Sequence, residues 1–105
     1  MAAAALGELY DLDIEKIEYA AEVAMEHHLG LTCDPVQGYV QIPCIERNAV
    51  AAMRAINALS LANFLTSTRK VKFDTVVQTM YQTGKDLMHK YRETSEGGLA
   101  LHYEA

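Results

Sequence analysis

The stretch CDPVQGYVQIPC, residues 33–44, contains both cysteines of the chain and divides it into two parts. Asp34, Pro35, Gly38 and Pro43 are typical of turns, and no regular period of apolar residues crosses 31–43, which predicts a loop. On either side, apolar residues recur at a spacing near 3.6 residues, which predicts helices. The stretch therefore indicates a helix, a loop and a second helix, with both thiols on the loop or at its edge.

Two helices are predicted before the loop. The alanine-rich segment 2–10 favours a helix that begins without a capping residue, as the back half of a longer helix would. A second helix is predicted over 14–29, with Asp11 or Asp13 as its N-cap and Gly30 just past its last turn.

Two more segments follow the loop. Pro43 favours a helix start, and the apolar period predicts a long helix over 44–64 with Cys44 in its first turn. After a polar joint at 66–72, Asp74 is predicted to cap a helix whose apolar stripe runs from Phe73 to Tyr91. Residues 92–105 are predicted to form an irregular tail that lies across the bundle.

These segments predict an all-α fold, because no alternating pattern indicates a strand. We expect a small bundle of three long helices plus a short N-terminal helix, with the cysteine-bearing loop between the second and third helices. Within it, Gly84 is expected to permit close approach of another helix. The methionines at helical spacing are predicted to fill the core, and these are Met25, Met53, Met80 and Met88.

Composition limits the classes of function. The chain has 105 residues, enough for one domain, and a net charge of −5 with scattered basic residues, which argues against a nucleic-acid partner. We predict no membrane span and no signal peptide, because no run reaches 18 apolar residues and the start lacks a basic region. Two cysteines without such a signal favour a reducing compartment, and the cytoplasm is expected.

Two thiols framing a proline-stiffened loop suggest an inorganic cofactor site. Cys44 lies at a predicted helix start, where unpaired backbone N–H groups favour a thiolate. Such sites suit zinc or an iron–sulfur cluster. Because C-x10-C is not a zinc-knuckle spacing, zinc would have to recruit His27 or His28. The alternatives are two buried, hydrophobic cysteines, a loop-closing disulfide, or a small helical interaction module without catalytic activity.

Two blocks of sequence carry a more specific signal. The run EHHLGLTCDPVQGYVQIPCIERNAV, residues 26–50, closely resembles the iron–sulfur-dependent L-serine dehydratases (L-serine ammonia-lyases) of bacteria. The run TMYQTGKDLMHKYRETSEGGLA, residues 79–100, resembles the end of the α (catalytic) domain of the same family. The resemblance implies a lyase that deaminates L-serine to pyruvate and ammonia.

The resemblance also implies a cofactor and partners. The family holds a [4Fe-4S] cluster on three cysteines, and Cys33 and Cys44 match two of them. The third lies in a Gly-Cys-Gln segment just upstream of a stretch like MAAAAL, and this chain starts after it. Residues 1–105 are therefore expected to be a C-terminal fragment of the α domain, inactive alone and metal-free or partly occupied. Expected partners are L-serine and the remainder of the dehydratase, meaning the upstream α segment and the β domain or chain; a homo-oligomer stays open.

Further candidates for the site are polar residues near the two blocks. Arg47 and Asn48 follow the second cysteine and are candidates to face the cluster or the serine carboxylate; alternatively Arg47 pairs with Glu46 or Glu26. His28 is expected to be a satisfied buried histidine, with support of the site or acid–base work as its alternative, and Lys85 is expected to be a solvated charge rather than a carboxylate partner.

One residue departs from the family pattern. Gln37 stands where the family loop commonly has glycine. Because a backbone position with positive φ tolerates Gln poorly, either the loop does not need that conformation there or Gly38 supplies the turn.

Overall fold

The computed structural model describes residues 1–65 and 69–103 and confirms the predicted all-α fold, since the described residues form no strand. Helices α2, α3 and α4 are the three long helices, and α1 is the short N-terminal one. The helices are α1 (Ala2–Leu9), α2 (Ile14–Glu26), α3 (Cys44–Phe64), α4 (Phe73–Asp86) and α5 (Gly98–His102), with 3-10 turns η1 (Val36–Gly38) and η2 (His89–Tyr91).

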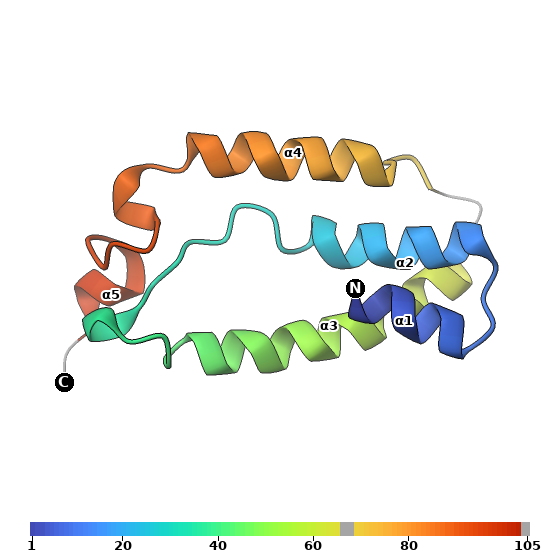
Figure 1. Ribbon diagram of the computed structural model, residues 1–105, viewed down its shortest axis with the longest axis horizontal. Helices are drawn as coiled ribbons and strands as arrows, with labels where there is room; N and C mark the ends of the chain where they lie inside the picture. The colour runs from blue at the N-terminus through green and yellow to red at the C-terminus, as the bar shows by residue number, and fades with distance from the viewer. Residues whose placement is uncertain (66–68, 104–105) are drawn as a thin grey trace.

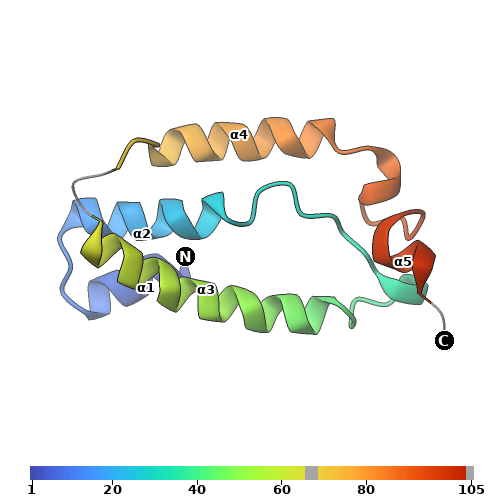
Figure 2. The same ribbon diagram turned by 180° about the vertical axis from the view of Figure 1, so that it is seen from behind.

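The helices form an elongated bundle of 47 × 25 × 17 Å. Helix α2 packs against α1, α3 and α4, and α1 also packs against α3 (Figure 1). Seen from behind, α3 crosses in front of α1 and continues past it (Figure 2). The loop 31–43 runs from the end of α2 to the far end of the molecule, where η1 contacts α5. The bundle core and the cysteine loop therefore occupy opposite ends of the chain's long axis.

The core is built mainly from small side chains, which let α1, α2 and α3 approach closely. A Cβ atom added at Gly7 of α1 would lie 3.0 Å from Cγ1 of Ile17 on α2. The cluster of buried residues consists of Ala3, Ala20, Val23, Ala55, Ala58 and Ala62. Alanine at these contacts, rather than a bulky side chain, sets the spacing of the helices.

The predicted methionine core is wrong. Met53, Met80 and Met88 are exposed, with 66%, 46% and 60% of their surface accessible, and only Met25 is half-buried. On α3 the buried positions are the alanines at 55, 58 and 62, whereas the larger apolar residues Ile45, Met53 and Ile56 are exposed. The period of the stripe correctly predicted a helix, but two faces of α3 are apolar and the smaller side chains pack inside.

Several helix boundaries differ from the predictions. Helix α2 has the expected N-cap at Asp13, whose carboxylate accepts from the N–H of Lys16 at 2.9 Å. It ends at Glu26 rather than near residue 29, and Gly30, at φ +73°, ends the turn that follows. The N-cap of α4 is Lys72, so the predicted cap at Asp74 lies inside the first turn.

The end of the chain is also more regular than predicted. Helix α4 stops at Asp86, and the expected stripe continues to Tyr91 only through η2. The tail forms the short helix α5 and packs on the cysteine loop instead of crossing the bundle. A Cβ atom at Gly84 would meet nothing within 4 Å in the described part of the chain, so this glycine does not permit a close helix contact there.

Part of the predicted joint at 66–72, residues 66–68, lies outside the described residues. Among the helices described, none combines the length and apolar character needed to cross a membrane.

Candidate functional site: the cysteine loop

Both cysteines are free, half-buried thiols at the two ends of the loop. The N–H of Cys33 donates to the carbonyl oxygen of Tyr91 at 2.9 Å, which ties the first cysteine to η2. Cys44 is the first residue of α3, directly after Pro43, as predicted. Its thiol therefore lies at a helix N-terminus, where the helix dipole favours negative charge.

The carboxylate of Asp34 is the centre of the loop's hydrogen bonds, and only 1% of the residue's surface is accessible. Its Oδ2 accepts from the hydroxyl of Thr32 at 2.7 Å and from Nη2 of Arg47 at 2.8 Å. Nη1 of Arg47 donates to the carbonyl oxygen of Thr32 at 2.7 Å. Because Asp34 adjoins the first cysteine and Arg47 lies one turn after the second, this ion pair joins the two ends of the loop.

The C-terminal segment closes over the same carboxylate. The N–H of Leu99 donates to Oδ1 of Asp34 at 3.2 Å, and the hydroxyl of Ser95 donates to the carbonyl oxygen of Pro35. Gly98, at φ +64°, passes so close to Asp34 that a Cβ atom there would overlap Oδ1. The start of α5 thus requires glycine for conformation and for space.

The middle of the loop turns through two consecutive left-handed residues. Gln37 has φ 54° and ψ 26°, and Gly38 has φ 79°. The expectation that the loop does not need positive φ at position 37 is therefore wrong, and Gly38 contributes to the turn without replacing Gln37 in it. A side chain at position 37 opposes the left-handed conformation, so Gln37 is held in it at a cost that glycine would not have.

Burial and neighbouring charges shape the electrostatics of the site. Burial, followed by the carboxylate of Glu93 and the thiol of Cys44, raises the pKa of Cys33, while Arg47 opposes the rise. Burial by itself would raise the pKa of Asp34, but the hydrogen bonds from Thr32 and Arg47 outweigh it and lower the pKa. Asp34 is therefore a carboxylate at neutral pH, and the metal-free Cys33 is a protonated thiol.

The structure engages Arg47 in the hydrogen bonds of the loop, whereas Asn48 and Lys85 are exposed. Arg47 pairs with Asp34, not with Glu46 or Glu26, so its guanidinium is engaged within the protein. Asn48 is exposed on α3, and Lys85 is exposed on α4 with its ammonium group 4.5 Å from the centroid of the Tyr81 ring.

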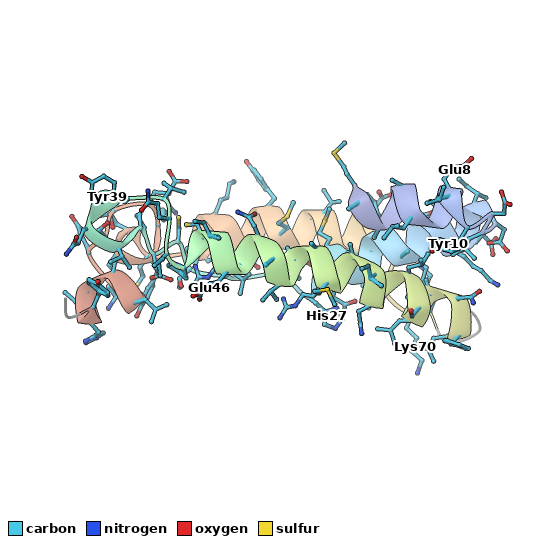
Figure 3. All side chains as sticks on the ribbon, turned by 90° about the horizontal axis from the view of Figure 1, so that it is seen from below. Glu8, Tyr10, His27, Tyr39, Glu46 and Lys70 are labelled. Carbon is cyan, nitrogen blue, oxygen red and sulfur yellow. The ribbon has the colours of Figure 1, made fainter. Side chains whose placement is uncertain are left out.

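The histidines lie in the turn after α2. Nδ1 of His28 contacts the carbonyl oxygen of Ala24, and its Nε2 is buried with no hydrogen-bond partner in the described part of the chain, so the predicted fully satisfied histidine is wrong. The carbonyl oxygen of His27 accepts from Arg54, which lies about 15 Å along α3 from Cys44. Figure 3 shows His27 beside the middle of α3, whereas Tyr39 and Glu46 lie at the loop end.

The zinc site that would recruit His27 or His28 is not formed in the described part of the chain. Among residues 1–65 and 69–103, no group of three His, Cys, Asp or Glu side chains is placed to hold a metal ion. The loop by itself offers two thiols.

Of the residues that fix this loop, the sequence singles out Arg47 as a site candidate, indicates only a turn at Asp34, and does not pair Ser95 or Leu99 with the loop. A signal existed in the sequence, because Gly97-Gly98 and the cysteine loop both lie in the family-like blocks. The 65-residue separation between Asp34 and Leu99, however, is bridged only by the tertiary structure.

Comparison with known proteins assigns the class. The family model described as "Serine dehydratase alpha chain" matches residues 1–100, and the chain belongs to this family. It is 59% identical to L-serine dehydratase 1 of Escherichia coli (strain K12) over 101 residues, 96% of this chain. It is 57% identical to the L-serine dehydratase of Haemophilus influenzae and 54% identical to that of Streptomyces coelicolor, each over 101 residues. The chain spans 22% of the length of each of these relatives.

Proposed function

We propose that this chain is the cysteine-loop part of an iron–sulfur L-serine dehydratase, an enzyme of the cytoplasm that converts L-serine to pyruvate and ammonia. The observation that carries the proposal is the loop 33–44 with two free thiols at its ends, in a chain that belongs to the serine dehydratase alpha family. Because the chain spans 22% of its relatives, we propose that it is inactive without the remainder of the enzyme.

The donor set of the loop fits part of a [4Fe-4S] cluster. Cluster irons are held by cysteine thiolates, and Cys33 and Cys44 are half-buried thiols, with Cys44 near enough to raise the pKa of Cys33. We propose these two as cluster ligands and a cysteine outside this chain as the third. The chemistry that the cluster supplies when bound is Lewis-acid stabilisation of the hydroxide that leaves L-serine.

The chain's own residues would hold and support the ligands. Cys33 must lose its proton on binding iron, and Arg47, the nearby positive charge that lowers its pKa, favours that loss. Cys44 is held at the N-terminus of α3 by the helix that begins with it. Asp34 pairs with Arg47 and holds its guanidinium against the loop. We propose a positioning role for Arg47 rather than contact with the serine carboxylate, because both of its terminal nitrogens already donate within the loop.

The test is a chimera in which this chain replaces the matching 101 residues of E. coli L-serine dehydratase 1. After anaerobic reconstitution with iron and sulfide, we expect about four irons per chain and serine-dependent release of pyruvate. Cys33→Ser and Cys44→Ser should each lower the iron content and abolish pyruvate release. Asn48→Ala, at an exposed position beside the loop, is the matched control and should keep the iron content of the parent.

Two results would contradict the proposal. One is release of pyruvate by a chimera that has no iron bound. The other is that both serine variants retain the iron content and activity of the parent. Pyruvate release by the 105-residue chain alone would contradict the proposed inactivity and leave the ligands to be judged by the serine variants.

A further inference from the structure

The chain exposes more surface than a protein of its mass normally does. Its accessible surface is 7597 Å², whereas a compact monomer of 11.6 kDa exposes about 5,800 Å². Its radius of gyration is 15.9 Å, against about 13 Å for a compact domain of this length. The excess of about 1,800 Å² matches what one partner contributes to a large obligate interface.

Part of the exposed surface is an apolar outer face of α3. Val50, Met53 and Ile56 are 50%, 66% and 51% exposed, although they are apolar and lie on one helix. They line a shallow groove together with Ala49, Asn57 and Ser60. Figure 3, which views the molecule from this side, shows α3 in front of the other helices with no described segment covering it.

The spacing of these residues indicates what covers them. Ala49, Met53, Ile56 and Ser60 are separated by four, three and four residues, the a/d spacing that packs lengthwise against another helix. Arg54 is the charged residue lining this groove, and its Nη1 is committed to the carbonyl oxygen of His27. The face therefore suits an apolar helix rather than an acidic or a nucleic-acid partner.

We propose that the outer face of α3 is the docking surface for an α-helix from the remainder of the serine dehydratase polypeptide. The occupant follows from the length of the relatives, because the matched residues make up 22% of them and the rest is available to cover this face. The inference rests on the proposed function only in taking its partner from the same enzyme; it does not require the cluster.

The test compares oxidation of Met53 by hydrogen peroxide in the isolated chain and in the chimera with E. coli L-serine dehydratase 1, each without iron. We expect Met53 to be oxidised at least tenfold more slowly in the chimera, because the docked helix covers it. In the isolated chain, Ile56→Glu should leave the melting temperature within about 2 °C, since the site is exposed there, but should lower that of the chimera by several degrees. Ile14 is 76% exposed on α2, and Ile14→Glu is the matched control. It should not strongly change the melting temperature of the isolated chain or of the chimera.

Equal oxidation rates of Met53 in the two proteins would overturn the proposal. So would self-association of the isolated chain in sedimentation that Ile56→Glu abolishes, because the occupant would then be a second copy of this chain. A chimera in which Met53 is protected but no iron binds would contradict the proposed cluster and support the docking surface. A chimera that binds iron while Met53 stays unprotected would contradict the docking surface and support the cluster.

Discussion

The carboxylate of Asp34 lies 2.8 Å from the guanidinium of Arg47, and this contact spans the loop between the two cysteines. Asp34 is almost fully buried, whereas the Arg47 side chain is 37% exposed. A buried carboxylate that loses its partner keeps its desolvation cost. The ion pair therefore fixes the loop conformation more than it adds to the overall stability of the chain.

Arg47→Gln should destabilise the chain by about 2 kcal/mol, because it leaves the Asp34 carboxylate buried without its cation. The measurement is urea unfolding at pH 7. Glu46→Gln, at the exposed neighbouring position, is the matched control and should change the free energy of unfolding by less than about 0.5 kcal/mol. A double-mutant cycle with Asp34→Asn should give a coupling free energy of about 1 kcal/mol or more between the two residues. Additive effects would refute a stabilising role for the Asp34–Arg47 ion pair.

Acid should weaken the same contact. The pKa of Asp34 is lower in the folded chain than its ordinary value, because the hydrogen bonds from Thr32 and Arg47 outweigh burial. Its stabilising contribution is therefore present above the ordinary carboxyl pKa and is lost as the pH falls through the folded-state value. Asp34→Asn should flatten this acid limb of the stability curve, and an unchanged limb would contradict the assignment.

Gln37→Gly should stabilise the chain by about 0.5–1 kcal/mol, because it removes the side-chain clash of a left-handed residue at φ 54°. Thermal unfolding by circular dichroism measures the change. The control is Gln41→Gly, the same substitution at an exposed loop position whose φ is not positive, where added chain entropy should destabilise. Equal effects at the two positions would rule out the conformational explanation.

Gly98→Ala should destabilise the chain by about 2 kcal/mol or more, since a methyl group there overlaps Asp34 Oδ1 and φ is +64°. Amide hydrogen exchange should report faster exchange at Leu99, whose N–H bonds Asp34. Gly84→Ala, inside α4 with no atom within 4 Å in the described residues, should instead stabilise by about 1 kcal/mol. If both alanines act alike, the close contact at Gly98 is not important for stability.

Glu22 should make the bundle less stable as the pH rises through neutrality. Burial, and then the neighbouring carboxylate of Glu26, raise the pKa of Glu22 from 4.5 to about 7. The folded state thus favours its protonated form, so the contribution is complete below pH 4.5 and is lost as the pH approaches and passes 7. The loss should reach at most about 3 kcal/mol.

Glu22→Gln keeps the shape of the protonated side chain and should remove this dependence, as measured by urea unfolding between pH 4.5 and 8. Glu8→Gln, at an exposed position of α1, is the control and should retain the slope. A parent chain equally stable at both ends of the range would refute the role of Glu22.

The local elements were predictable because their causes are local. Asp13 caps α2 through a side chain three residues from its N–H partner, and Pro43 precedes α3 in a chain whose apolar period runs on to Phe64. The ends of α2 and α4 were predicted too far along, because the apolar residues continue into turns that the period alone does not separate from helix.

The sequence by itself determined that this chain is helical, where its cysteines lie relative to the helices and to which family it belongs, since propensity, capping and motif act over a few residues. Only the tertiary structure decided which apolar face of α3 is buried and that Asp34 joins Arg47 to the backbone of Leu99. Alanines pack inside because close helix contacts select small side chains, and a period of 3.6 does not reveal that choice. The partners of a buried carboxylate are set by the path of the chain in space, and here one of them lies 65 residues away.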